Sequence, residues 1–379
     1  MNTEMEIKLD DISDSEVIER IKELKHELSD QVTILGHHYQ QDDIIAFADI
    51  TGDSLILSQE AAKIKKPYTI FCGVHFMAET ADILAKNKEQ KIILPDLEAG
   101  CSMADMAQVD DVRAAMNLFK DIFSNSKKNN NNNNKEKIVP ITYVNSSAAI
   151  KAFVGEHDGY VCTSSNAEKI IKEAFKVGKR AFFLPDQHLG RNTCYKLGIP
   201  LEEMYLYDPH ENQQNHQNHH NNDLQKQISK AKVILWNGYC SVHQGFSVEQ
   251  IENVRKTSPE TKIIVHPECP FDVVMKSDLA GSTAYICKVI AEAAKGTKFA
   301  VGTEINLVNR LAQKYKTEKE IKSLSPYQCI CSTMYRIKPK ALLSALLSIK
   351  NKRPINVIKV DEQIKKMALK AINRMLAIS

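Results

Sequence analysis

Short runs of consecutive apolar residues, rich in valine and isoleucine, recur along the chain. Continuous runs of this length are typical of strands that are buried on both faces of a parallel sheet. The predicted strands are Val32–Leu35, Thr69–Val74, Ile92–Leu94, Ile138–Val144, Ala181–Leu184, Val233–Trp236, Ile263–Val265 and Phe299–Val301. Between them, Ala167–Val177 and Ala284–Ala294 have the apolar spacing of helices. Alternating strands and helices predict an α/β protein with parallel sheets.

One plan is repeated three times along the chain. In each repeat a strand ends in polar residues, a hydroxyl residue opens a helix, a further strand follows, and a cysteine ends the repeat. The polar strand ends are His37 and Tyr39, Tyr143 and Asn145, and His266 and Glu268. The hydroxyl residues are Ser54, Ser164 and Ser282 with Thr283, and the cysteines are Cys101, Cys240 and Cys331. The repeats predict three related α/β units.

The same plan gives predicted domain boundaries. We expect a first αβα unit with an N-terminal helix at 1–125, a second at 136–257 and a third at 258–340. C-terminal helices follow at 341–379, because apolar residues recur at helical spacing beyond Asp361. Two polar tracts, Asn129–Asn134 and Glu211–Asp223, predict disordered loops inserted into this plan. We interpret the histidines of the second tract, His216, His219 and His220, as low-complexity sequence rather than metal ligands.

Composition excludes several classes of protein. The 379 residues carry a formal charge of +3 without a basic cluster, so no nucleic-acid partner is expected. No apolar run approaches the roughly 18 residues of a membrane span. The acidic, polar start of the chain lacks the apolar segment of a secretory signal, which predicts a cytoplasmic protein. In a reducing compartment, nine cysteines indicate metal binding, catalysis or burial rather than disulfides.

The cysteines that end the repeats predict a metal centre. Ligands bind at the carboxyl ends of parallel strands, so three units around a common axis would bring Cys101, Cys240 and Cys331 together. Three thiolates are one fewer than hold an ordinary cubane iron–sulfur cluster, which leaves one iron for substrate. Zinc is the competing metal. We predict burial as small apolar residues for Cys72, Cys162, Cys194, Cys269 and Cys287, whereas Cys329 competes with Cys331 as a ligand. The hydroxyl residues before the helices predict helix caps, anion sites, or both.

At these residues the chain resembles the quinolinate synthase family. The resemblance runs in family order from about residue 31 to residue 334. The matching stretches include His37-His38-Tyr39-Gln40, Gly52-Asp53-Ser54-Leu55, Cys101-Ser102-Met103-Ala104, Tyr143-Val144-Asn145-Ser146, Pro185-Asp186-Gln187-His188-Leu189-Gly190, Gly238-Tyr239-Cys240-Ser241-Val242-His243, His266-Pro267-Glu268-Cys269-Pro270 and Gly302-Thr303-Glu304. Each stretch alone is weak evidence, and their joint order is specific.

The resemblance implies three homologous αβα sandwich units around a pseudo-threefold axis and a [4Fe-4S] cluster. The implied ligands are Cys101, Cys240 and Cys331, because Cys331-Ser332-Thr333-Met334 fits the family's Cys-x-x-Met. The implied reaction condenses iminoaspartate with dihydroxyacetone phosphate to quinolinate, phosphate and water in NAD biosynthesis. The implied partners are an L-aspartate oxidase or dehydrogenase that supplies iminoaspartate, and the iron–sulfur assembly machinery. Another hydro-lyase with an open [4Fe-4S] iron, and an iron–sulfur sensor or carrier, are the alternatives.

The resemblance also implies residue roles. It places the carboxylates of iminoaspartate at His37, Ser54 and Ser164. It places triose handling and proton transfer at Tyr143, Asn145, His266 and Glu268, and the phosphate at Ser282 and Thr283. Tyr39 and His243 line the same cavity. Glu268 is the expected general base, because triose isomerisation needs a carboxylate or similar group within a dry pocket.

Overall fold

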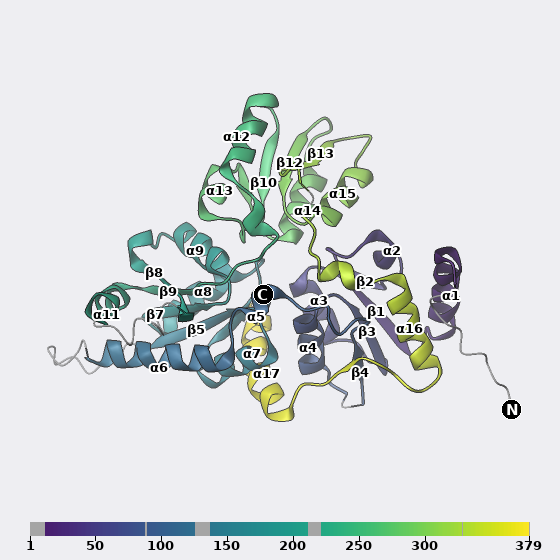
Figure 1. Ribbon diagram of the computed structural model, residues 1–379, viewed down its shortest axis with the longest axis horizontal. Helices are drawn as coiled ribbons and strands as arrows, with labels where there is room; N and C mark the ends of the chain where they lie inside the picture. Colours follow the sequence, from purple (N-terminus) through teal and green to yellow (C-terminus); the bar gives the residue numbers. More distant parts are fainter. Residues whose placement is uncertain (1–11, 88, 126–136, 211–220, 328, 379) are drawn as a thin grey trace. The chain divides into compact units, whose positions relative to one another are not determined.

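The computed structural model describes residues 12–87, 89–125, 137–210, 221–327 and 329–378 (Figure 1). Within these residues the protein has α/β architecture with three mainly parallel sheets, as the sequence predicted. The chain divides into two compact units, residues 1–100 with 331–359 (unit 1) and residues 101–330 with 360–379 (unit 2). The first sheet belongs to unit 1, and the second and third sheets belong to unit 2. The four-part division of the sequence stays a prediction.

The first sheet has the order β14-β4-β3-β1-β2. Its strands are β1 (Val32–His37), β2 (Ile50–Gly52), β3 (Tyr68–Cys72), β4 (Lys91–Ile93) and the antiparallel β14 (Val357–Ile358). Its helices are α1 (Asp14–Glu27), α2 (Asp42–Ile45), α3 (Ser54–Ala61), α4 (His75–Leu84) and α16 (Pro339–Lys350). All six residues of β1 are buried, which explains its continuous apolar sequence. The α16 helix, from the far end of the chain, packs on α1.

The second sheet has the order β6-β5-β7-β9-β8 and is entirely parallel. Its strands are β5 (Ile138–Tyr143), β6 (Tyr160–Cys162), β7 (Arg180–Leu184), β8 (Met204–Tyr207) and β9 (Val233–Trp236). Its helices are α5 (Ser102–Asp105), α6 (Val109–Asn125), α7 (Ala148–Glu156), α8 (Ala167–Val177), α9 (Gln187–Lys196) and α11 (Asn221–Lys230), with a 3-10 turn, η2 (Leu201–Glu203). Asp186 caps α9 by accepting hydrogen bonds from the first turn of that helix.

The third sheet has the order β11-β10-β12-β13 and is also parallel. Its strands are β10 (Lys262–Val265), β11 (Leu279–Ala280), β12 (Lys298–Gly302) and β13 (Glu320–Ser323). The associated helices are α12 (Val248–Thr257), α13 (Phe271–Lys276), α14 (Thr283–Glu292) and α15 (Ile305–Lys314), with the 3-10 turn η3 (His243–Gly245) before α12. The 3-10 turn η4 (Met334–Arg336) follows β13 in the sequence and belongs to unit 1. Ile263, Val265, Ala300 and Leu324 contribute to its apolar core.

The three sheets share one strand order, which confirms the repeated plan read from the sequence. In each sheet the first strand of the repeat pairs with the short second strand on one side and with the third strand on the other. The fourth strand lies beyond the third, and one of the three cysteines follows it in sequence. The second sheet adds β8 at the far edge, and β8 precedes the inserted tract in the sequence. The eight predicted strands are all present, and the edge strands β2, β6, β8, β11, β13 and β14 were missed because two to four residues are too few to carry a periodicity.

The tail forms the expected amphipathic helix, α17 (Glu362–Ile378), which packs on α7 and buries Ala368, Ala371, Ile372 and Met375. The two helices approach closely at Gly155, where an added Cβ would lie 1.9 Å from the carbonyl oxygen of Met367. Only glycine fits at that crossing, because any side chain would overlap the backbone of α17. The pairing fixes the end of the chain to the second sheet.

The two polar tracts have different outcomes. The first tract, Asn129–Asn134, lies outside the described residues, as do residues 211–220 of the second with His216, His219 and His220. The end of the second tract was predicted wrongly, because helix α11 begins at Asn221. Composition alone missed this helix, whose apolar residues Leu224 and Ile228 come later in the sequence. Over the described part of the chain, no helix is long and apolar enough to cross a membrane.

Candidate active site

Polar residues that follow four strands of unit 2 converge on one buried cluster. Tyr143 ends β5, His243 follows β9, His266 and Glu268 follow β10, and Thr303 follows β12. All five side chains are buried, with no more than 4% of any one exposed. Carboxyl ends of parallel strands are the usual binding edge of α/β sheets, which is why residues far apart in sequence meet there.

Glu268 lies at the centre of this cluster. The Tyr143 hydroxyl donates a hydrogen bond to Glu268 Oε1 at 2.5 Å, and His243 Nδ1 lies 2.9 Å from Oε2. The His266 ring stacks on His243, with centroids 4.5 Å apart and an interplanar angle of 22°. A carboxylate only accepts hydrogen bonds, so His243 carries a hydrogen on Nδ1. In the neutral ring, His243 Nε2 then accepts from the Thr303 hydroxyl at 3.1 Å.

The electrostatics of the cluster keep Glu268 ionised and His266 neutral. Burial raises the pKa of Glu268, but the nearby histidines and the hydrogen bonds from His243 and Tyr143 outweigh it and lower that pKa to about 2. Burial lowers the pKa of His266 to about 3, with His243 adding to the effect and Glu268 opposing it. The sequence interpretation expected a carboxylate in a dry pocket, and the structure buries the Glu268 carboxylate. Its hydrogen bonds nevertheless stabilise the charged form.

The sequence analysis gave no role to two residues at this site, Thr303 and Asp186. Thr303 orients His243 and directly follows a buried strand, which is the signal used for His37 and Tyr143. Asp186 is fully buried, and its pKa is raised well above its usual value by desolvation and then by the charge of Glu268. Its Oδ1 accepts from the backbone N–H groups of His188 and Leu189. Asp186 therefore combines a helix cap with a buried carboxyl whose charged form desolvation and Glu268 disfavour.

Cys240 is next to the acid–base cluster. One ligand atom each from Cys240, His243 and Glu268 lies within 4.8 Å of the other two. Thiolate, imidazole and carboxylate are the donor types that hold transition metals. The segment after Cys101 is tied to the segment before Cys240, because Trp236 Nε1 donates to the carbonyl of Met106 at 2.8 Å. Cys331 belongs to unit 1, where its Sγ lies 3.4 Å from Thr333 Oγ1.

The burial of the cysteines separates them into groups. Cys101, Cys240 and Cys331 are partly exposed, whereas Cys72, Cys162, Cys194 and Cys269 are buried as predicted. Cys287 is only half-buried, so its predicted burial was wrong; it lies on the amphipathic helix α14 rather than in a strand. Cys329 packs against the apolar core of the third sheet, and desolvation raises its pKa. An apolar setting disfavours a thiolate, which supports Cys331 over Cys329 as the predicted ligand.

A cavity of about 430 Å³ in unit 2 is lined by both Ser164 and Ser282. Ser282 caps α14 by accepting from the backbone N–H of Tyr285, and Thr283 is buried beside it. Ser164 is not the cap of α8, whose N-cap residue is Asn166. Asn145 is half-buried, and its Oδ1 has no hydrogen-bond partner among the described residues. Of the residues that the resemblance placed at substrate, this cavity brings together Ser164 and Ser282.

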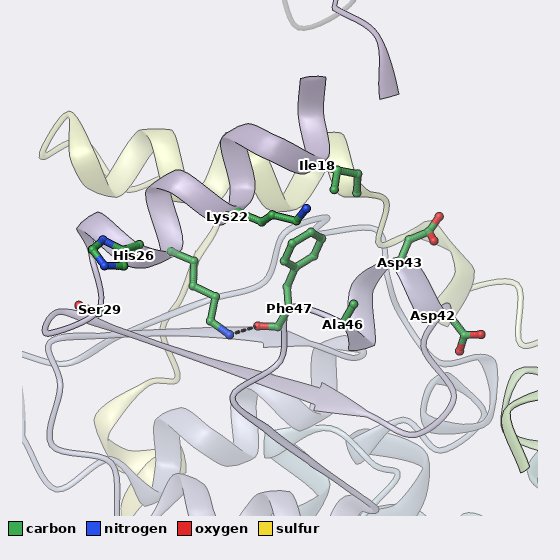
Figure 2. Close-up of a pocket in the computed structure, with 9 residues that line it drawn as sticks. Ile18, Lys22, His26, Ser29, Asp42, Asp43, Ala46 and Phe47 are labelled. Carbon is green, nitrogen blue, oxygen red and sulfur yellow. Dashed lines mark hydrogen bonds between the residues drawn. The ribbon is translucent and has the colours of Figure 1, made fainter. Parts of the chain in front are cut away.

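The remaining predicted site residues, His37, Tyr39 and Ser54, lie in unit 1. The rings of His37 and Tyr39 meet edge to face at 4.8 Å, and His37 Nδ1 accepts from the backbone N–H of Tyr39 at 3.1 Å. Ser54 begins α3, but Asp53 is the residue that caps this helix. A separate cavity in unit 1 lies between α1 and α2, and Lys22, His26 and Phe47 are among the residues that line it (Figure 2). None of the predicted site residues lines it.

Fold and site together define a class of protein. Parallel α/β units whose strand ends gather a buried carboxylate, two histidines, a tyrosine and a half-buried cysteine have the composition of an enzyme active site. Residues 19–377 match the family model described as quinolinate synthetase A protein. The chain belongs to this family, as the sequence resemblance predicted.

Relatives of known name align in sequence with nearly the whole chain. A protein of Anoxybacillus flavithermus named quinolinate synthase is 51% identical over 97% of this chain and 94% of its own length. The quinolinate synthase of a Geobacillus species is 49% identical over 98% of both chains. That of Bacillus cereus is 48% identical over 96% of this chain and 94% of its own length. The chain is therefore an enzyme of a family that acts in NAD biosynthesis.

Proposed function

We propose that this enzyme condenses iminoaspartate with dihydroxyacetone phosphate to give quinolinate, one phosphate and two waters. The observation that carries the proposal is the Tyr143–Glu268–His243 hydrogen-bond chain, buried beside Cys240. Closing a pyridine ring from these two substrates needs protons removed from carbon and hydroxyl groups protonated as they leave. The names of the relatives give the product, and the buried chain supplies groups of the required type.

Within this proposal, Glu268 accepts protons from the triose. Its lowered pKa keeps it in the ionised form that a base needs, and Tyr143 and His243 hold both carboxylate oxygens. Tyr143 is the proposed relay on the other side of the exchange: once Glu268 holds a proton from the triose, it can return that proton to the Tyr143 oxygen while the Tyr143 hydrogen passes to a leaving hydroxyl group. His266, which is neutral, orients the triose by hydrogen bonding rather than by charge.

We further propose that the anionic parts of the substrates bind at helix starts and strand ends. Ser164 and Ser282 line one cavity, and Ser282 with Thr283 opens helix α14. Backbone N–H groups at a helix start favour phosphate and carboxylate without a lysine. The lysine of this cavity, Lys196, is paired with Glu168 at 3.0 Å. His37, Tyr39, Ser54 and Asn145 complete the proposed substrate contacts.

The proposed cofactor is a [4Fe-4S] cluster held by Cys101, Cys240 and Cys331. The residues fit such a group, because these cysteines are partly exposed while four others are fully buried, and Cys240 adjoins polar side chains. When bound, the cluster supplies an iron without a fourth thiolate, which acts as a Lewis acid on a substrate oxygen. Iron–sulfur assembly machinery, an enzyme that makes iminoaspartate and a reducing cytoplasm are parts of the same proposal.

The test is an anaerobic assay of the iron–sulfur-reconstituted protein with dihydroxyacetone phosphate and freshly generated iminoaspartate. We expect quinolinate that requires both substrates and the cluster. The Glu268→Gln variant should retain the cluster and lose turnover. If the cluster is intact and the two substrates together give no quinolinate, the proposal is contradicted, and another dehydration reaction at the same site is favoured.

A further inference from the structure

Helix α9 touches both loops that carry the acid–base residues of unit 2. At its start, Gln187 Nε2 donates to Asn237 Oδ1 at 2.6 Å, and the backbone N–H of Gln187 donates to the carbonyl of Gly238. One residue later, His188 Nε2 lies 2.5 Å from Gln244 Oε1, beside His243. Farther along, α9 packs near α13, which follows the Glu268 loop. The helix therefore lies where it can set the distance between the two loops.

Asn192 makes the contact between α9 and the Glu268 loop. Its side chain is buried, and Nδ2 donates to the carbonyl of Pro267 at 2.8 Å and to that of Cys269 at 2.9 Å. A side-chain amide has two N–H hydrogens, so this pair of bonds uses both. The two carbonyls belong to the residues on either side of Glu268. The amide thus holds the backbone directly before and after the carboxylate residue.

The sequence of this loop explains why it needs an outside donor. Pro267 and Pro270 have no backbone N–H, so the segment has few donors of its own. The backbone N–H of Cys269 donates to the carbonyl of His266, which closes a tight turn around Glu268. Buried carbonyls without donors are rare in folded proteins. Asn192 supplies the two donors from a helix of the neighbouring sheet.

The amide oxygen of Asn192 gives an independent indication. Among the described residues, Oδ1 is buried and has no hydrogen-bond partner. A buried acceptor without a donor is unfavourable, so a side chain chosen only for packing would be apolar here. An asparagine at this position is explained by its two donors, which an apolar residue of the same shape lacks.

We propose that Asn192 is a positioning residue that fixes Glu268 for proton transfer. The clamp on the carbonyls of Pro267 and Cys269 sets where the Glu268 side chain leaves the backbone, and so keeps its oxygens within reach of Tyr143 and His243. A misplacement of about 1 Å in a catalytic group costs about 100-fold in rate. The functional part of the inference rests on the proposed role of Glu268, and the clamp itself does not.

The test compares Asn192→Leu, Asn192→Ala and the matched control Cys194→Ala in the cluster-loaded enzyme. Leucine retains the branched shape without donors, and alanine removes both shape and donors. Cys194 is a buried residue of the same helix that takes no part in the clamp. Hydrogen–deuterium exchange of a peptide covering residues 262–276 measures the loop, and steady-state kinetics give kcat and KM.

We expect both Asn192 variants to exchange about 10-fold faster or more in this peptide, with the α9 and β5 peptides unchanged. Their kcat should fall about 100-fold, while KM for both substrates stays within about threefold. Cys194→Ala should match wild type in loop exchange and kcat.

The clamp would be contradicted if the 262–276 peptide of Asn192→Leu exchanged at the wild-type rate, or if exchange became faster throughout unit 2. Faster loop exchange with undiminished kcat would overturn the positioning role. If wild type makes no quinolinate, exchange still reports on the clamp while the proposed function fails.

Discussion

The Tyr143 hydroxyl donates to Glu268 Oε1 at 2.5 Å, although 125 residues separate the two along the chain. Tyr143 ends a strand of the second sheet, and Glu268 follows a strand of the third. The bond therefore joins two repeats of the α/β plan within unit 2. It also stabilises the ionised carboxylate, because a hydrogen bond donated to a charged oxygen is stronger than one donated to a neutral carboxyl group.

The first prediction concerns that bond. Tyr143→Phe removes the hydroxyl and keeps the ring, so the pKa of Glu268 should rise toward its ordinary value and one proton donor is lost. We expect kcat/KM for quinolinate formation to fall about 100-fold or more. Tyr195→Phe is the control, because that exposed tyrosine meets Phe271 through its ring. Equal activity of the Tyr143 variant and the control would rule out a role for the hydroxyl.

The second prediction concerns the pH dependence of stability. The folded pKa of His266 is about 3 and its unfolded value is near 6.5, so the unfolded chain binds the proton first. Stability is lost as pH falls below 6.5, by about 1.4 kcal/mol at pH 5.5. Glu268 is ionised in both states over this range, because its ordinary pKa of 4.5 falls to about 2 on folding.

Denaturant unfolding at pH 6.5, 6.0 and 5.5 measures this loss. His266→Asn cannot titrate, so between pH 6.5 and pH 5.5 its free energy of unfolding should fall less than that of wild type by about 1 kcal/mol, since about 0.4 of the 1.4 kcal/mol is already lost at pH 6.5. His188, whose pKa is also lowered, is present in both proteins and cancels in the comparison. Parallel pH curves for the two proteins would show that His266 titrates normally in the folded state.

The third prediction concerns the backbone before Cys240. A Cβ on Gly238 would lie 2.4 Å from the carbonyl oxygen of Pro185, so Gly238→Ala forces these two segments apart. We expect a loss of about 1–3 kcal/mol in the free energy of unfolding. Gly245→Ala is the control, because an added Cβ there meets nothing within 4 Å. Denaturant unfolding of both variants measures the difference, and equal stability would contradict the close approach.

The fourth prediction concerns the proposed cluster. Cys240→Ser should lose both bound iron and sulfide after anaerobic reconstitution, together with quinolinate formation. Cys287→Ser is the control, because Cys287 is a half-buried cysteine on α14, outside the predicted ligand set. Iron and sulfide analysis with electron paramagnetic resonance of the reduced protein gives the readout. Full activity of Cys240→Ser without iron would refute the proposed cofactor.

Much of the fold follows from local sequence. The apolar runs at Ile138–Val144 and Val233–Trp236 predict buried strands because continuous apolar sequence fits a strand covered on both faces. Short edge strands such as β11 (Leu279–Ala280) were missed, since two residues form a strand only when a neighbour supplies hydrogen bonds. Helix α11 was missed for a similar reason, because its first residues are polar and its neighbours lie elsewhere in the chain.

For the site, the sequence by itself determined which chemistry is present: polar residues at strand ends and a cysteine at the end of each repeat, because repetition marks those positions. Only the tertiary structure decided which of them meet. It brought Tyr143, His243 and Glu268 into one hydrogen-bond chain and lowered the pKa of a buried carboxylate that burial alone would raise. It also gave Thr303 and Asn192 their contacts. Hydrogen bonds and desolvation depend on distances between strands, and a linear sequence does not contain those distances.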